Sequence, residues 1–203
     1  DVYKRQVTLR LVAFIIHQKP LVLYPSLPRL VEAVVKSLDP THAMVRSSLA
    51  KSATLMINEL VQTYPTIAFH GGTQRLAVGT HDGPVVLYDL KTGTRLYVLD
   101  GHKGAVTAFS FSPDGRRFLS MSLAEELVLI WQLHAGVLDM FRRPSRFSAR
   151  HEPSSDCRSI QIHLGPAAQL SQADTLRQVK FEWRDSRSVR LCVGQAHVNV
   201  GVV

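Results

Sequence analysis

The chain has 203 residues, 45% of them hydrophobic, which is enough for one large domain or two small ones with ordinary cores. It carries 24 Lys and Arg against 16 Asp and Glu, a formal net charge of +8. With only Cys157 and Cys192, the sequence excludes a disulfide-stapled secreted scaffold and favours a reducing, cytoplasmic setting. The apolar stretch near the N-terminus is interrupted by Arg10, Lys19 and Pro20, so we expect neither a membrane span nor a signal peptide.

Three helices are expected within residues 7–64. The first covers about 7–17, where apolar residues are dense, and ends at Lys19-Pro20. The second starts after Ser26, a good N-cap, and the third follows Asp39-Pro40. The third helix carries one apolar stripe, formed by Val45, Leu49, Ala53, Met56, Ile57, Leu60 and Tyr64. Three helices with short turns are typical of an α-solenoid of the HEAT or armadillo kind, although a three-helix bundle gives a similar pattern.

Within residues 65–133 the hydrophobic period changes to two, and two segments about 42 residues apart resemble each other. The aligned pairs are Phe69 with Phe111, Leu76 with Phe118, Thr80 with Ser122 and, after one inserted residue, Tyr88 with Trp131. A period in the low forties, with an aromatic residue closing each unit, indicates β-propeller blades. We therefore expect two blades here, and a segregated α+β fold in which helices precede a partial propeller.

The last third of the chain has a weaker pattern. Residues 134–175 are expected to form a flexible basic linker rich in Pro, Ser and Arg, with its densest positive run at Arg142, Arg143, Arg146 and Arg150. Residues 176–203 contain two strand-like runs, Val179–Trp183 and Val189–Val193. These runs indicate a terminal hairpin, half of a third blade, or strands that complete the second blade.

The second repeat unit resembles the WD repeat. The resemblance is carried by Asp100-Gly101-His102, the turn at Phe111–Gly115 and the closing Trp131. In that family a buried hydrogen-bond chain runs from the His of a Gly-His pair through a Ser or Thr and an Asp to the Trp indole. The resemblance implies these roles for His102, Ser122 and Trp131, while the Asp position is missing and Glu125 or Glu126 stands nearby.

The first unit keeps part of the same pattern but has no Gly-His pair before it. The resemblance gives structural roles in the two blades, and no catalytic role, to His102, Ser122, Trp131, Thr80, Asp82, Tyr88, Asp114 and Gly115. The turns are expected at Asp82-Gly83 and at Ser112-Pro113-Asp114-Gly115.

A helical segment that runs directly into WD blades resembles, more narrowly, the C-terminal end of the rabconnectin-3 beta family. The stretches RLAVGTHDGPVVLYDLKTGT and GHKGAVTAFSFSPDGRRFLS carry this resemblance. It implies a cytoplasmic scaffold whose partners are the rabconnectin alpha chain and the vacuolar proton-pumping ATPase. It also implies that the protein reaches vesicle membranes only peripherally, through those partners.

The sequence therefore predicts a non-enzymatic scaffold with no cofactor and no metal site. The pairs Cys157–His163 and Cys192–His197 lack the tight first spacing of zinc sites, and His81-Asp82 lacks a nucleophile elbow or oxyanion loop. The first alternative is a nucleic-acid or anionic-lipid binding module that acts through the basic C-terminal segment. A hydrolase is the second alternative.

Overall fold

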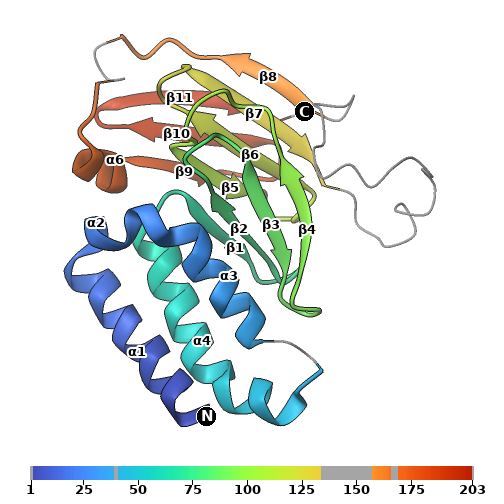
Figure 1. Cartoon of the computed structure of the whole chain (residues 1–203). Helices are drawn as coiled ribbons and strands as arrows, with labels where there is room; N and C mark the ends of the chain where they lie inside the picture. The colour runs from blue at the N-terminus through green and yellow to red at the C-terminus, as the bar shows by residue number, and fades with distance from the viewer. Residues whose placement is uncertain (1, 39–40, 134–156, 166–168, 203) are drawn as a thin grey trace.

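The computed structural model describes residues 2–38, 41–133, 157–165 and 169–202 (Figure 1). Helices come first and three antiparallel sheets follow, which confirms helices followed by WD-type sheets. The helical elements are α1 (Val2–Gln18), α2 (Pro20–Leu23), a 3-10 turn (Tyr24–Ser26), α3 (Leu27–Ser37) and α4 (Ala43–Thr63). In the part of the chain that the structure describes, no helix is long and apolar enough to cross a membrane.

The helices form one small bundle. They are too few to show the α-solenoid that the sequence analysis expected. In α1 the amide of Gln6 donates to the Ser48 carbonyl of α4 at 2.7 Å, and Arg10 donates to the Ser52 hydroxyl at 3.4 Å. Because both contacts join residues 42 positions apart, α1 and α4 run parallel and side by side. The first helix also begins earlier than the expected residue 7.

The bundle and the first sheet share one hydrophobic core. Met56 and Leu60 of α4 are fully buried and belong to the same cluster as Leu76, Val78 and Tyr88 of the sheet. The guanidinium of Arg46 on α4 also donates to the Leu38 and Leu90 carbonyls, which ties α4 to the end of α3 and to the sheet. The helices therefore cover the face of the first sheet that points away from the second sheet (Figure 1).

The three sheets follow one another along the chain. The first contains β1 (Ile67–His70), β2 (Arg75–Gly79), β3 (Val85–Asp89) and β4 (Thr94–Leu99), paired in that order. The second contains β5 (Ala108–Phe111), β6 (Arg117–Ser122), β7 (Leu127–Gln132) and β8 (Cys157–Gln161), again in chain order. After α6 (Gln172–Gln178), the third contains β9 (Val179–Trp183), β10 (Ser188–Val193) and β11 (Ala196–Gly201).

The first strands of the three sheets lie next to one another. The Phe109 amide of β5 donates to the Pro65 carbonyl just before β1, at 3.0 Å. The Trp183 indole of β9 donates to the Ser110 hydroxyl of β5, also at 3.0 Å. One apolar cluster fills the space between the first and second sheets, and another fills the space between the second and third. Each sheet thus buries at least one face against a neighbouring sheet, as stacked repeat units must.

The expected linker over 134–175 is wrong in its C-terminal part, and residues 134–156, with the densest basic run, lie outside the described residues. Cys157–Gln161 forms β8, the fourth strand of the second sheet, and α6 begins at Gln172. The strand was missed because it is a mostly polar edge strand, with no fully buried residue to produce an alternating pattern. After it, Ile162 and Leu164 are buried in the core of the second and third sheets.

The last segment forms three strands, one more than a hairpin. β10 lies in the centre and pairs antiparallel with β9 on one side and β11 on the other. Lys180 and Glu182 form an ion pair at 2.6 Å on β9, on the opposite side of the strand from Val179, which is buried against the second sheet. These strands make a separate third sheet and do not complete the second.

We predict that Tyr64→Phe weakens the junction between helices and sheets by about 1 kcal/mol, the usual contribution of one hydrogen bond. Tyr64 is fully buried, and its hydroxyl donates to the Pro20 carbonyl at 2.7 Å. Burial raises the pKa of Tyr64 to about 12. Since the unfolded residue titrates near 10, its contribution is complete below about pH 10 and is lost as the pH rises toward the folded pKa. Denaturant titrations between neutral and alkaline pH measure the free energy of unfolding of both proteins. We expect this free energy to fall less steeply with rising pH in Tyr64→Phe than in the wild type, and parallel pH dependences would contradict this.

Candidate functional site

A chain of buried polar groups crosses the second sheet. The Trp131 indole Nε1 on β7 lies 2.9 Å from the Ser120 hydroxyl on β6, which lies 2.9 Å from His102 Nε2. His102 Nδ1 is 2.8 Å from a Glu125 carboxylate oxygen, and the other oxygen accepts from the Lys103 amide at 2.7 Å. We call His102, Ser120, Glu125 and Trp131 the polar network. It ties the loop before β5 to the β6–β7 turn and to the closing tryptophan.

The chemistry of Trp131 and Glu125 fixes the direction of the hydrogen bonds at the two ends of the polar network. An indole can only donate, so the Ser120 oxygen accepts from Trp131. The Ser120 oxygen also lies 2.9 Å from His102 Nε2, and these two atoms share the next hydrogen bond of the network. An ionised carboxylate can only accept, so His102 Nδ1 donates to Glu125. Because each group is satisfied in turn, burial of His102, which is 4% exposed, carries no penalty of an unpaired polar atom.

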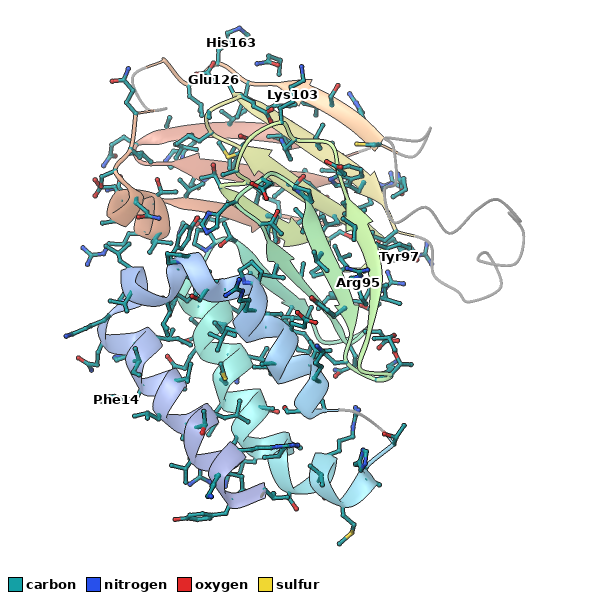
Figure 2. All side chains as sticks on the ribbon, in the orientation of Figure 1. Phe14, Arg95, Tyr97, Lys103, Glu126 and His163 are labelled. Carbon is teal, nitrogen blue, oxygen red and sulfur yellow. The ribbon has the colours of Figure 1, made fainter. Side chains whose placement is uncertain are left out.

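Glu125 takes the position that the family pattern gives to Asp. Partial burial alone would raise the pKa of its carboxyl, but the hydrogen bonds from the His102 ring and the Lys103 amide outweigh burial and hold this pKa below its usual value. Glu126, the other candidate, instead accepts a hydrogen bond from the Leu164 amide at 3.3 Å. Figure 2 shows Glu126 and Lys103 at the same end of the second sheet.

The expected role of Ser122 is wrong, because Ser120 supplies the hydroxyl. Both serines are fully buried on β6, but the Ser122 hydroxyl has no hydrogen-bond partner. The repeat offset of 42 places Val78, a fully buried core residue, at the position of Ser120. The first sheet therefore cannot form the same network, although it keeps an aromatic residue, Tyr88, at the position of Trp131.

The other expected residues of the first unit lie at a turn that contacts the polar network's loop. The Thr80 hydroxyl donates to the Pro84 carbonyl at 2.8 Å and closes the turn, in which Asp82 is exposed. Gly83 has φ +105°, and a Cβ there would clash with the His102 carbonyl. The turn of the first sheet therefore presses directly on the backbone of His102 and requires glycine at this position. Tyr88 contributes its ring to the core beneath the helices.

The turn between β5 and β6 is fixed by Asp114 and Gly115. A hydrogen bond from the Ser112 hydroxyl, at 2.5 Å, is the main cause of the lowered pKa of Asp114, and the Arg116 amide also donates to this carboxylate. Gly115 has φ +67°, and a Cβ there would meet the ring of His70 in the first sheet. Each of these turns is thus in contact with the neighbouring sheet.

His70 is a residue that the sequence reasoning missed. Its Nε2 donates to the Pro113 carbonyl at 3.1 Å, while its Nδ1 accepts from the Thr73 amide at 3.2 Å. The side chain therefore closes its own turn and bridges the first and second sheets. The repeat in the sequence could have identified His70, because the 42-residue offset aligns it with Ser112. Ser112 closes the corresponding turn of the second unit.

A groove of about 450 Å³ lies where the first strands of the three sheets meet α4 and α6. Its lining is rich in aromatic rings, including Phe69, Phe109 and Trp183. Arg177 and Lys180 also line it, whereas no Asp or Glu does. The groove exposes polar and apolar surface in about equal parts, and a concave surface of this volume can accommodate a ligand or a peptide segment.

The residues considered as metal ligands or catalysts are spread over separate elements. Cys157 lies on β8, where burial raises the pKa of its thiol to about 11, and His163 is exposed beyond that strand. Cys192 of β10 pairs directly with His197 of β11, so these two residues are neighbours, but His163 and Cys157 lie in another part of the chain. His81 packs against the ring of Tyr24. Among the described residues no three His, Cys, Asp or Glu side chains come close enough together to hold a metal ion.

We predict that Ser120→Ala destabilises the fold by about 1–3 kcal/mol, because it leaves His102 Nε2 and the Trp131 indole without their buried partner. Ser122→Ala is the matched control: it lies on the same strand, is equally buried and has no hydrogen bond to lose. Denaturant unfolding of both variants measures the difference. Equal losses would show that the polar network does not stabilise the sheet.

We predict that Glu125→Gln costs about 1–3 kcal/mol near neutral pH, where the ionised carboxylate accepts two hydrogen bonds. A lowered folded pKa gives stability that is present above the unfolded value, near 4.3, and is lost as the pH falls through the folded pKa. The wild type and the variant should therefore converge in acid. Glu126→Gln, outside the polar network, serves as the control, and a gap independent of pH would refute the assignment.

The comparisons with known proteins agree with this geometry. A family model described as "WD domain, G-beta repeat" matches residues 93–124, which run from the β3–β4 turn to the β6–β7 turn. The chain is 31% identical over 121 residues to pre-mRNA-processing factor 19 homolog 2 of Arabidopsis thaliana, covering 59% of this chain and 22% of that protein. It is 38% identical over 63 residues to human WD repeat-containing protein 3, covering 31% and 7% respectively.

Among solved structures, the chain is similar to the β-propeller domain of Cps50 (Swd1) from Myceliophteria thermophila. The TM-score is 0.43 and the sequence identity 19%, over 70% of this chain and 35% of that one. The chain thus spans well under half of each of these proteins. The chain therefore contains a WD repeat at residues 93–124, within a series of antiparallel sheets.

Proposed function

We propose that this chain is a non-enzymatic scaffold that binds other proteins through the sheet surfaces and the groove. The proposal depends on one observation: the side chains of the polar network are hydrogen-bonded to one another and largely buried. Every member of the polar network is engaged inside the second sheet, and His102 and Trp131 are only 4% and 6% exposed. Because the side chains of the polar network stabilise the fold, we expect partners to bind to the exposed surfaces of the sheets and to the groove.

The groove supports a protein partner with acidic and apolar side chains. Its lining combines aromatic rings with the exposed Arg177 and with Lys180, which is paired with Glu182, so Arg177 is the cation that we expect to meet an acidic partner. Complementary charge speeds association and selects partners, and the aromatic rings add apolar contact. Because β1, β5 and β9 meet at the groove, the packing of the three sheets sets its shape.

The narrower part of the proposal rests on the sequence resemblance to the rabconnectin-3 beta family. On that basis the partners are the rabconnectin alpha chain and the vacuolar proton-pumping ATPase, and the protein is cytoplasmic and peripheral on vesicles. The relatives named above are other WD-repeat proteins, so they support a scaffold role in general. The direct test of the narrower part is recovery of these partners.

We predict that the immobilised chain retains vacuolar ATPase or rabconnectin alpha subunits from cytosol, and that Arg177→Glu reduces this retention at least several-fold. The substitution reverses a charge at the groove, where Arg177 is exposed and its carboxylate partner would be in the ligand. Arg184→Glu makes the same change in the β9–β10 turn, outside the groove, and should retain the partners. Mass spectrometry of the eluates, after nuclease treatment, gives the measurement.

Three outcomes contradict parts of the proposal. Recovery of nucleic acid alone, released by moderate salt, would favour the alternative module with a basic C-terminal segment. Retention of other proteins that is sensitive to Arg177→Glu would keep the scaffold and remove the vacuolar assignment. If the chain hydrolyses a substrate in a standard activity screen and a single substitution abolishes this activity, the protein is an enzyme and the scaffold proposal is wrong.

A further inference from the structure

The exposed large apolar side chains are confined to the helical bundle. In the described part of the chain they are Tyr3, Val7, Leu11, Phe14, Leu21, Val22, Met44 and Leu55. All eight lie before the first strand, and Phe14 and Val22 are 62% and 65% exposed. Contiguous apolar exposure of this kind marks an interaction surface, whereas isolated exposed residues are ordinary.

Four of these residues form one stripe along α1. Tyr3, Val7, Leu11 and Phe14 are spaced by four, four and three residues, which places them on one side of the helix. The opposite side of α1 packs into the core through Leu9, Val12, Ala13 and Ile16. We call Tyr3, Val7, Leu11 and Phe14 the α1 outer face. Figure 2 shows Phe14 projecting from α1 away from the rest of the bundle.

Helix α4 extends this apolar surface across its contact with α1. Ser52 and Glu59 of α4 contact Arg10 and His17 of α1, respectively. Leu55 follows Ser52 by three residues and precedes Glu59 by four, so it lies on the side of α4 that borders α1 and is 49% exposed. The apolar surface therefore spans two parallel helices, and Leu21 and Val22 of α2 continue it at one end.

The charge around this surface is almost entirely positive. Helix α1 contains no acidic residue, and by helical spacing Lys4 and Arg10 lie beside the apolar stripe. On α4, Lys51 precedes Leu55 by one turn and is exposed. Among the described residues of the bundle the only carboxylates are Glu32 and Glu59, and each already lies beside a basic side chain, Lys36 and His17 respectively. An apolar surface flanked by cations selects an anionic, apolar partner.

We propose that the α1 outer face, with Leu55, Leu21 and Val22, binds the surface of a bilayer that contains anionic phospholipids. Such a bilayer supplies acyl chains for the apolar side chains and negative headgroups for the flanking Lys and Arg. A protein partner would need an apolar surface of matching shape with acidic residues at its rim, whereas an anionic bilayer offers both chemistries over its whole surface. The groove described above contains none of these residues, and the apolar side chains project from an outward helix surface. The protein lies on the membrane and does not span it.

The test is co-sedimentation of the full chain with vesicles of phosphatidylcholine that contain about one-third phosphatidylserine. The double variant Leu11→Ser/Phe14→Ser should bind about a hundredfold more weakly, because two large apolar side chains no longer enter the acyl region. The matched control is Thr8→Ser/Ala50→Ser, which changes two exposed helix positions outside the surface and should bind like the wild type. Unchanged thermal melts of both variants would show that folding is not the cause.

A second pair of variants tests the charge. Lys51→Glu, next to Leu55, should weaken binding by about tenfold, while Lys91→Glu in the β3–β4 turn should not. Vesicles of phosphatidylcholine alone should bind weakly. Equal binding to both vesicle types would overturn the electrostatic part, and no binding by the wild type would overturn the proposal.

Two further outcomes also overturn it. If Leu11→Ser/Phe14→Ser binds normally and a variant with Arg142, Arg143, Arg146 and Arg150 changed to Gln does not, the basic C-terminal segment is the lipid site. If the wild type is a dimer by light scattering and the double variant is a monomer that still binds vesicles, the α1 outer face is instead an interface between copies of this chain.

Discussion

The burial of sheet faces is the constraint on which this fold depends. A sheet of the WD type exposes two largely apolar faces and is stable only when both are covered. Here the first sheet is covered by α4 and α3 on one face and by the second sheet on the other, and Tyr64 lies fully buried where the helices give way to β1. The helical bundle thus occupies the place beside the first sheet at which a propeller would hold another blade.

This arrangement explains why the polar network lies where it does. The second sheet packs between two others, so both of its faces are covered, and Phe118, Leu119 and Met121 are fully buried there. A polar group in such surroundings is stable only when it is paired. His102, Ser120 and Glu125 satisfy one another in sequence, which fixes one register for the loops they join. The first sheet, with Val78 in place of the serine, relies on apolar packing against the helices.

Local patterns in the sequence predicted the helices, the two repeat units and the turns, because each depends on residues close in the chain. These local patterns could not predict whether Ser120 or Ser122 accepts the hydrogen bond from Trp131. Residues two apart on a strand point to the same face, so alternation cannot separate the two serines. The register decides: Phe118 pairs with Trp131, which brings the indole to the next residue on that face, Ser120. The inserted residue before Trp131 hid this relation.

Local patterns also could not predict that β8 pairs with β7. The two strands are separated by 24 residues, and the polar edge strand depends on its neighbour for its structure. The same reasoning applies to the groove, whose lining comes from residues 61–70, 108–113 and 176–183. Sequence patterns show which residues are apolar or charged, but only the stacking of three sheets shows which of them share a surface.

The contact between Gly83 and the backbone of His102 has a consequence for how the chain folds. In an ideal repeat protein each unit can unfold at its own free energy, with only a pairwise term at each boundary. Here the turn of the first unit packs directly on the backbone of His102, the loop residue from which the polar network of the second unit begins. Opening either unit removes support from the other, so the two sheets form one cooperative block. Hydrogen exchange in β3 and β6 should then report a single opening event, although the strands belong to different repeats.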